Sequence, residues 1–544
     1  MKRGTQLSGR IVDVIGRREY PGTIEIADGR IQRILPGSGR PEGPLLLPGL
    51  VDAHIHVESS MLPPAEFARW ALVRGTVASV SDPHEIANVL GMEGVDYMIA
   101  EGKRSPFKFC FGAPSCVPAT AEETAGAVLN PKAVDRLLAR PEIGYLAEVM
   151  NFPGVLARDP AVMAKIESAR RRGKPVDGHA PGLRGAQARA YAAAGITTDH
   201  ECFTLAEAKD KLRAGMKILI REGSAARNFA ALAPLLKSAP ERCMFCCDDL
   251  HPDLLMVRHL DEHVRRALRG GANRFDVIAC ATLHPVRHYG LDVGLLQAGD
   301  PADLIVVDDW KRFGVQQTYV GGRLVATGGH SLLPFHRAAK INRFAAKPRV
   351  AADFAVAAGT GRMRVIEALD GQLITRTLRL LPTVRRGQAV ADPRRDLLKI
   401  AVVNRYAPAA PALGFIRGFG LKRGAMASTI AHDSHNIVAV GTSDQALADA
   451  VNAVIAHRGG ISVVGRGPPA VLPLPIAGLM SDQDGRMVAR QYTELDARAK
   501  ALGSKLRAPF MTLSFMALLV IPDLKLSDRG LFSGSRWKFE PLFG

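Results

Sequence analysis

Cysteine is scarce in this sequence, and its scarcity limits the kinds of protein that the chain can be. The 544 residues include 7 cysteines, an odd number at a density too low for a disulfide framework. Three of them lie close together at Cys243, Cys246 and Cys247. One CxxC without a second pair is a weak signal for zinc, and the flanking residues are apolar and strand-like. We therefore interpret these three as buried structural thiols.

Long apolar runs are also missing. The N-terminal segment MKRGTQLSGRIVDVIG lacks the apolar core of roughly 7–15 residues that a signal peptide needs. The longest apolar stretch near the end, Met511 to Pro522, is too short to span a bilayer. The sequence therefore predicts a cytoplasmic protein with no membrane association. A hydrophobic content of 47% and a charged content of 23% are typical of a folded globular chain, which excludes disorder as its main state.

Acidic residues are too few to balance the basic ones. The chain has 71 Lys and Arg against 53 Asp and Glu, a net charge of +18. Such a surplus suits nucleic acid or an anionic membrane, and part of it is concentrated in residues 362–423. That stretch contains Phe415 and Phe419 but no long Lys/Arg run and no signature of the usual RNA-binding modules. We interpret it as a basic domain surface near a neighbouring subunit, with nucleic-acid binding as the alternative.

The length and the changes of pattern along the chain predict three domains. Residues 1–48 contain short β-like runs separated by Gly, Pro and Asp, and residues 290–345 return to the same kind of sequence. We expect these two segments to form one small, discontinuous β-sandwich-like domain. Residues 49–289 alternate short apolar runs with amphipathic segments. Residues 346–544 alternate strands and helices again, which predicts a separate C-terminal α+β domain.

The middle segment predicts a closed barrel. Eight short apolar runs end near His56, Asp82, Gly112, Met150, His179, His200, Ile220 and Asp248. Helix candidates between them are Pro63–Arg74, Pro131–Ala139, Asp159–Arg172, Leu183–Ala194 and Ala225–Lys237. Strands that alternate with helices imply parallel βαβ units, and eight such units imply an α/β fold of the (β/α)8 TIM-like barrel type.

Histidines and carboxylates lie at the ends of these predicted strands, where barrel enzymes build their active sites. His54 and His56 are two residues apart on the first strand, so their side chains point the same way. Other candidates are Glu148 on the fourth strand, His179 on the fifth, His200 on the sixth and Asp248 on the eighth.

A lone HxH would favour a structural interpretation, but this constellation favours metal. Four imidazoles and several carboxylates around one mouth would be costly to bury without a cation. Imidazole and carboxylate suit zinc, iron or manganese. A set of this size exceeds what one catalytic ion needs, so it favours two metals bridged by a carboxylate.

The order of these residues resembles the amidohydrolase superfamily, and finer motifs resemble its adenine deaminase family. The motifs are PGLVDAHIHVESS (48–60), SDPHEIANV (81–89), GHAPG (178–182), TDHE (198–201), DDLHP (248–252), HDSHN (432–436), RGG (458–460) and PFMTLSF (509–515). They occur in order over nearly the whole chain. Many superfamily members carry a carbamylated Lys on strand four, but residues 144–154 contain no Lys. The resemblance implies that Glu148 bridges the metals instead.

The resemblance also implies a reaction, in which water converts adenine to hypoxanthine and ammonia in purine salvage. By the same resemblance, two divalent ions per subunit, Mn²⁺ or Fe²⁺ ahead of Zn²⁺, would be held by His54, His56, Glu148, His179, His200 and Asp248. We expect Asp248 also to take the proton from the attacking water, and Glu85 is the candidate for the proton shuttle. Candidates for substrate contacts or the pocket are Asp249, His84, His251, Glu58 and Ser59. The expected assembly is a homo-oligomer, a dimer or tetramer.

Several alternatives stay open at this point. The nearest is another amidohydrolase reaction, by a cyclic amidase, an N-acetyl sugar deacetylase or a different aminopurine deaminase, because fold and metal do not determine substrate. A non-catalytic scaffold is disfavoured, since every candidate ligand is present. The H-x-E…P-C-x-x-C signature of zinc deaminases that act on nucleic-acid bases is missing. We therefore expect a free small-molecule substrate and no nucleic acid. For the segment 432–436, a polar loop and a flap or second metal site are equally good interpretations.

Overall fold

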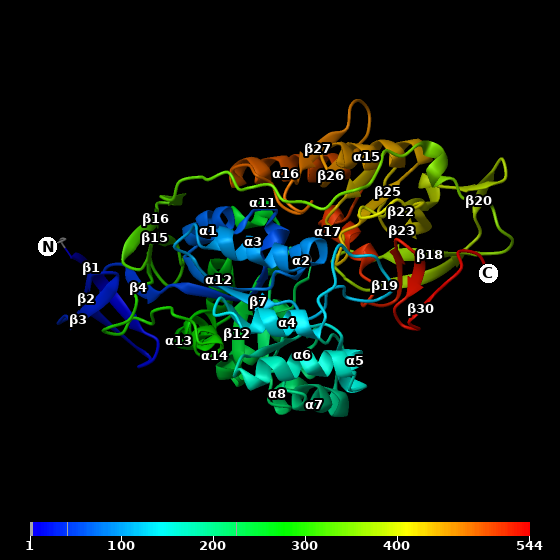
Figure 1. Ribbon diagram of the computed structural model, residues 1–544. Coiled ribbons are helices and arrows are strands. Elements are labelled where there is room, and N and C mark those ends of the chain that lie inside the picture. The colour runs from blue at the N-terminus through cyan, green and yellow to red at the C-terminus, as the bar shows by residue number, and fades with distance from the viewer. Residues whose placement is uncertain (1–3, 41, 225) are drawn as a thin grey trace.

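The computed structural model describes residues 4–40, 42–224 and 226–544. Figure 1 shows a central barrel with a small sheet of early strands at one end and a second large sheet of late strands at the other. The first three residues of the predicted N-terminal segment lie outside the described residues. The division of the chain into three domains at the expected boundaries stays a prediction.

Eight parallel strands form the barrel, and each ends within two residues of its predicted position. They are β5 (Leu50–His56), β6 (Thr76–Ser81), β7 (Lys108–Ala113), β8 (Ile143–Val149), β9 (Val176–Gly178), β10 (Thr198–Asp199), β11 (Lys217–Arg221) and β12 (Cys243–Cys246), which β13 (Asp248–Asp249) continues. Hydrogen-bonded ladders run from β13 through β5 to β9 and from β10 to β12. A backbone bond from Thr197 N to Val176 O joins β9 to the start of β10. The predicted α/β barrel class is confirmed.

Helices surround this barrel. They are α1 (Pro64–Val73), α2 (His84–Leu90), α3 (Met92–Gly102), α4 (Pro131–Leu138), α5 (Phe152–Leu156), α6 (Pro160–Arg171), α7 (Gly185–Ala193), α8 (Leu205–Arg213), α9 (Phe229–Leu232), α10 (Leu235–Ser238), α11 (Pro252–Leu255), α12 (Leu260–Arg269), α13 (Arg274–Ala281) and α14 (Leu283–Tyr289). Short 3-10 turns are η1 (Val57–Ser60) and η2 (Pro240–Arg242).

One predicted helix is wrong in its form. The sequence predicts a continuous helix over Ala225–Lys237, but the structure has two four-residue helices, α9 and α10, with Pro234 between them. Proline donates no backbone hydrogen bond and its ring clashes with the preceding turn, so the helix ends before it. Residue 225, where the prediction began, lies outside the described residues.

The small sheet joins the beginning of the chain to residues after the barrel. Its order is β17-β16-β15-β14-β4-β1-β2-β3. Its strands are β1 (Thr5–Asp13), β2 (Arg18–Ala27), β3 (Arg30–Pro36), β4 (Leu45–Pro48), β14 (Leu304–Val307), β15 (Val315–Val320), β16 (Arg323–Thr327) and β17 (His330–Ser331). The connection is the antiparallel pairing of β4 with β14, in which Leu46 lies opposite Val306. Both strands are apolar and buried. The sheet therefore needs strands from before the barrel and strands from after it.

The C-terminal part is built on a second sheet of order β19-β18-β23-β22-β25-β24-β26-β27. Its strands are β18 (Met363–Ala368), β19 (Thr375–Leu380), β22 (Leu398–Val403), β23 (Ala412–Arg417), β24 (Ala425–Ser428), β25 (Ile437–Gly441), β26 (Gly460–Val464) and β27 (Ala470–Pro473). Two smaller sheets hold β20 (Thr383–Arg385) with β21 (Gln388–Val390), and β28 (Leu524–Ser527) with β29 (Gly530–Ser533) and β30 (Lys538–Phe539). Its helices are α15 (Asp444–Ala456), α16 (Gly485–Ala501) and α17 (Pro509–Ser514), with 3-10 turns η3 (Ala351–Phe354), η4 (Pro393–Arg395) and η5 (Phe515–Ala517).

This second sheet lies against the end of the barrel where its strands terminate. Helix α16 packs on α1 and α11, and residue Ser481 N bonds to Met61 O just after β5. In Figure 1, α17 sits between the late sheet and the barrel helices. The carboxyl ends of the barrel strands are therefore covered by the C-terminal part of the chain.

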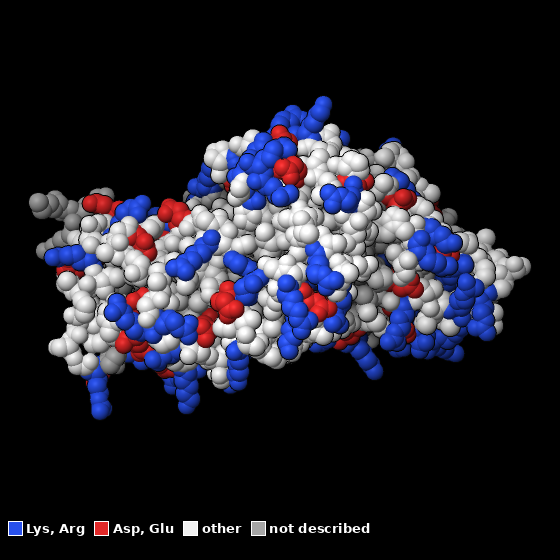
Figure 2. All heavy atoms as spheres, turned by 90° about the horizontal axis from the view of Figure 1, so that it is seen from below, with Lys and Arg blue, Asp and Glu red and all other residues white. Residues whose placement is uncertain are grey.

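The thiols follow the expected pattern. Cys243, Cys246 and Cys247 are buried on or beside β12. Figure 2 shows Lys and Arg spread over one face and densest at the C-terminal end. Among the described residues, no helix is long and apolar enough to cross a membrane.

Candidate metal centre and active site

Side chains from five barrel strands meet at the mouth of the barrel. His54 and His56 point inward from β5, and Asp248 of β13 lies beside them because β13 pairs with β5. The Nε2 atoms of His54 and His56 are 3.2 Å apart. Asp248 Oδ1 lies 3.3 Å from His56 Nε2 and 3.8 Å from His54 Nε2.

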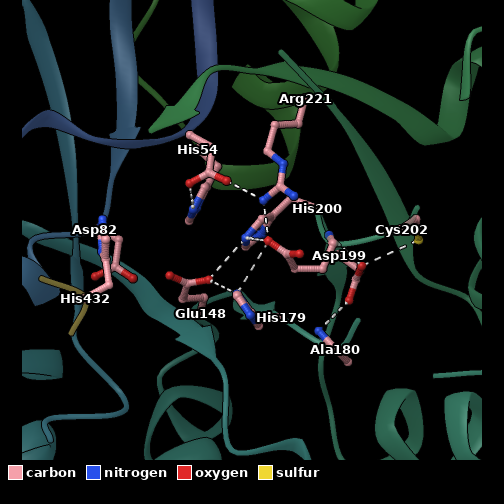
Figure 3. Close-up of polar contacts among 12 residues, drawn as sticks. His54, Asp82, Glu148, His179, Ala180, Asp199, His200, Cys202, Arg221 and His432 are labelled. Carbon is pink, nitrogen blue, oxygen red and sulfur yellow. Dashed lines mark hydrogen bonds and ion pairs between the residues drawn. The ribbon is translucent and has the colours of Figure 1, made fainter. Parts of the chain in front are cut away.

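Glu148 occupies the centre of the group (Figure 3). Its Oε1 lies 3.3 Å from Nε2 of His56. Its Oε2 lies 2.6 Å from Nδ1 of His179 and 3.1 Å from Nε2 of His200. The two oxygens therefore face two different sets of imidazoles, which is the arrangement of a carboxylate that bridges two cations. Glu148 is 2% exposed, so water does not satisfy it from outside.

The imidazole nitrogens of this group are suited to binding divalent metal ions. His56 Nδ1 lies 3.1 Å from the carbonyl oxygen of Asp82. Nδ1 must donate there, so the neutral ring keeps a lone pair on Nε2, the atom aimed into the centre. Nδ1 of His54 and Nε2 of His179 are buried without a hydrogen-bond partner. Buried polar atoms of this kind are rare unless another group satisfies them.

The electrostatics point the same way. Burial alone would lower the pKa of His179, but the carboxylates of Glu148 and Glu201 raise it to about 9. Burial would likewise lower the pKa of His56, and the carboxylates of Asp248 and Glu148 raise it well above its usual range. The negative charge of these carboxylates favours positive charge beside them, and bound divalent cations would supply it.

Arg221 and Glu201 complete the centre, and the sequence did not single them out. Nη1 of Arg221 contacts both Glu201 and Asp248, and all three side chains are buried. Asp248 has a φ of 56°, a left-handed conformation that a non-glycine residue adopts at a cost. The signals available were the position of Arg221 at the end of β11 and of Glu201 directly after His200, but neither type of residue is distinctive there.

A second network holds the loops that carry two of the imidazoles (Figure 3). The Asp199 carboxylate accepts bonds from Ala180 N at 3.0 Å and from Glu201 N at 2.9 Å. Lys211 Nζ lies 2.9 Å from the same carboxylate. The residues that follow His179 and His200 are therefore tied to one buried carboxylate.

Four of the substrate and proton-transfer candidates, His84, Glu85, Asp248 and Asp249, face the same cavity. It is lined by His56, His84, Glu85, Glu148, Met150, His179, His200, Glu201, Arg221, Asp248, Asp249, Leu373, His432, Asp433, Phe515 and Leu518. Its volume is about 30 Å³, far below the roughly 300–1,000 Å³ of most small-molecule sites. Leu373, Phe515 and Leu518 line it from the C-terminal part of the chain.

The remaining candidates lie behind this lining. Ser59 Oγ donates to Asp249 Oδ1 at 2.5 Å. Glu58 Oε1 accepts a bond from Ile86 N at 3.2 Å, at the start of α2. His251 Nδ1 lies 2.5 Å from the hydroxyl of Tyr492 on α16. These three residues support the loops and the C-terminal contact, and the structure does not bring them to the cavity wall.

Comparison with known proteins agrees with the architecture. Residues 45–325 match the model of the amidohydrolase family, and residues 372–538 match the adenine deaminase C-terminal domain. An adenine deaminase of Salinibacter ruber is 58% identical over 545 residues, with 100% of each chain covered. Adenine deaminases of Methanosarcina acetivorans and Borreliella burgdorferi are 50% and 44% identical, and 98% and 97% of this chain is covered. The chain belongs to the adenine deaminase family of the amidohydrolases.

Proposed function

We propose that the protein hydrolyses adenine to hypoxanthine and ammonia, as a step of purine salvage. The observation that carries the substrate is the 58% identity, from end to end, to a protein named adenine deaminase. The arrangement of Glu148 between two sets of imidazoles supports the hydrolytic chemistry.

Membership of the amidohydrolase family implies divalent-metal use, and the mouth of the barrel has the clusters for it. His54, His56, Glu148, His179, His200 and Asp248 would hold two ions, with Mn²⁺ or Fe²⁺ preferred over Zn²⁺. When bound, such ions supply Lewis acidity that lowers the pKa of water into the neutral range.

The side chains of this chain supply the proton transfers. Asp248 accepts the proton that the attacking water releases as its oxygen adds to C6 of the purine. Glu85 starts the cycle ionised and takes up both protons of the water in turn, the first by way of Asp248. It delivers them to the ring nitrogen beside C6 and to the leaving amino group, so both carboxylates end the cycle ionised. The two protons of one water thus become the new N–H of hypoxanthine and the third hydrogen of ammonia. Asp249, held by Ser59, accepts a hydrogen bond from a purine N–H.

Closure of the cavity has its own part in this scheme. A cavity of about 30 Å³ is far smaller than the roughly 300–1,000 Å³ of small-molecule sites, so we propose that the side of the cavity formed by Leu373, Phe515 and Leu518 moves outward to admit the substrate. Once closed, this side of the cavity keeps bulk water away and strengthens the electrostatic interactions inside.

The direct test is to load the purified protein with Mn²⁺ and follow the ultraviolet change from adenine to hypoxanthine. We expect conversion that disappears after chelation and returns when metal is restored. A protein that binds two metals and leaves adenine unchanged would refute the adenine assignment. A panel of cyclic amides, N-acetyl sugars and other aminopurines would then identify the alternative amidohydrolase reaction. Native metal, oligomeric state and cellular location stay predictions from the sequence.

A further inference from the structure

The loop His432–Asn436 brings histidines from the C-terminal sheet to the barrel mouth. It connects β24 to β25, and its motif HDSHN plays no part in the reaction scheme above. His432 and His435 are 3% and 0% exposed. Their target is Glu85, the second residue of α2, which directly follows β6.

Each oxygen of Glu85 faces one of these histidines. His432 Nδ1 lies 2.8 Å from Oε1, and His435 Nε2 contacts Oε2. The nearest ion-pair nitrogen from the barrel, Nε2 of His84, is 3.7 Å from Oε1. The carboxylate is therefore held mainly from the C-terminal sheet, although its backbone belongs to the barrel.

The hydrogen-bonding of His435 decides between a metal site and a proton donor. Its Nδ1 accepts a bond from the backbone N–H of Ala431 at 3.3 Å. The proton of the neutral ring must then be on Nε2, the atom that contacts Glu85. In this tautomer Nε2 has no lone pair for a cation, so the cluster favours donation to Glu85 over metal binding.

The loop is held rigidly enough to orient its target. Asn436 Nδ2 donates to Thr124 O of a barrel loop at 2.8 Å, and Asn436 Oδ1 accepts from Arg405 N at 3.0 Å. The ring of His432 stacks on Phe515, with centroids 4.9 Å apart. His435 has a left-handed φ of 55°, a strained conformation that persists where its surroundings enforce it.

We propose that His432 and His435 are positioning residues that hold the carboxylate of Glu85 for proton transfer, so that the C-terminal sheet completes the active site of the barrel. This inference rests on the proposed function, because Glu85 is the proton shuttle only in that scheme. With both oxygens held by imidazole nitrogens, the ionised carboxylate is fixed in the orientation in which it accepts a proton and passes it to the substrate. Burial would raise the pKa of Glu85, but the two imidazoles hold it well below its usual range, so the resting carboxylate is ionised and ready to accept the first proton.

Pairs of substitutions at each histidine separate the loss of the N–H donor to Glu85 from the loss of side-chain volume. His435→Gln keeps a side-chain N–H near the position of Nε2, and His432→Asn keeps one near Nδ1. His435→Ala and His432→Ala remove the donor. In the metal-loaded full chain we expect each alanine variant to lower kcat by about 10- to 100-fold, which is part of what acid–base catalysis contributes. KM should change by less than about threefold, and the acidic limb of the kcat–pH profile should move to higher pH. The Gln and Asn variants should recover most of kcat.

The controls are metal content and thermal unfolding of each variant, which we expect to match the parent. Alanine variants with the parental kcat and pH profile would overturn the proposal, and so would losses that Gln and Asn fail to restore. A crystal structure of the metal-loaded His435→Ala protein provides a readout without substrate. If Glu85 kept its orientation there, the positioning role would be wrong even if the parent deaminates adenine. If the parent leaves adenine unchanged while Glu85 moves in that structure, the proposed function fails and the positioning role stands.

Discussion

The hydroxyl of Ser59 donates a 2.5 Å hydrogen bond to Oδ1 of Asp249, which joins the turn after β5 to the end of the eighth barrel strand. Both residues are buried, and Asp249 lines the cavity while Ser59 lies behind it. Burial and the neighbouring Asp248 raise the pKa of Asp249, so the bond from Ser59 helps to keep this carboxylate ionised and pointed at the cavity.

Ser59→Ala should therefore weaken substrate recognition. A hydrogen bond to a charged group contributes about 1.5–3 kcal/mol, so we expect kcat/KM for adenine to fall about tenfold at the lower end. Steady-state kinetics measure this directly. Ser60→Ala is the control, because Ser60 Oγ bonds to Val57 O instead. Equal kinetics in both variants would show that Asp249 does not depend on Ser59.

Glu148→Gln should lower the metal content. The amide keeps the size of the side chain but removes the negative charge that faces four imidazoles, those of His56, His84, His179 and His200. Loss of a residue that only hydrogen-bonds to a metal ligand lowers metal affinity or activity by about 10- to 100-fold. Glu148 is proposed as a ligand itself, so we expect its substitution to lower activity by more than about 100-fold. Metal analysis should find fewer than two ions per chain.

The control for this substitution is Glu101→Gln. Glu101 is also a buried carboxylate, on α3, and its ion-pair partner is Arg104. It should keep its metals and its activity. If Glu148→Gln bound two ions as tightly as the parent, the bridging assignment would be wrong.

Arg221→Gln should lower both stability and turnover. The guanidinium lies between the buried carboxylates of Glu201 and Asp248, and removing one partner of a buried ionic group costs about 3–5 kcal/mol. We expect a lower unfolding midpoint in the metal-free protein and a kcat reduced about 100-fold, because Asp248 loses its orientation. Arg227→Gln nearby changes an arginine whose side chain is 40% exposed and should leave both quantities near the parent. Parental turnover in Arg221→Gln would contradict the orienting role.

Lys525 should make the stability depend on pH. It is fully buried on β28, and its Nζ donates to Leu373 O at 2.6 Å and Phe515 O at 3.0 Å. Burial lowers its pKa from 10.5 to about 7. Between these values the unfolded chain binds the proton and the folded chain does not, so the unfolding free energy rises with pH across this window. Below about pH 7 both states are protonated and the full penalty remains.

The measurement is urea unfolding of the parent and of Lys525→Met at about pH 7.5 and about pH 9.5. One pKa unit corresponds to about 1.4 kcal/mol, so the parent should gain about 2 kcal/mol relative to the variant over this interval. The two lost bonds to carbonyl oxygens destabilise the variant equally at both values. A constant difference between the two proteins would show that this lysine is charged in the folded chain.

The barrel and most of the residues at its mouth could be predicted from local sequence. The runs ending at His56, Met150, His179 and His200 are short, apolar and followed by polar side chains, and β5, β8, β9 and β10 end within two residues of those positions. Local pattern suffices here because a parallel strand buried on both faces must be apolar along its length. The broken helix around Pro234 shows the limit of this approach, since periodicity over Ala225–Lys237 outweighed a single helix-breaking residue.

The sequence by itself determined which side chains end the barrel strands, because strand periodicity and the direction of parallel strands place His54, His56 and Asp248 at one mouth. Only the tertiary structure decided what surrounds them. Glu85 meets His435 across 350 residues of chain, and no local pattern encodes a contact between a barrel helix and a loop of the C-terminal sheet. Arg221 likewise became part of the centre through two carboxylates on neighbouring strands. Such contacts depend on how whole elements pack, and therefore on the burial of surfaces contributed by distant parts of the chain.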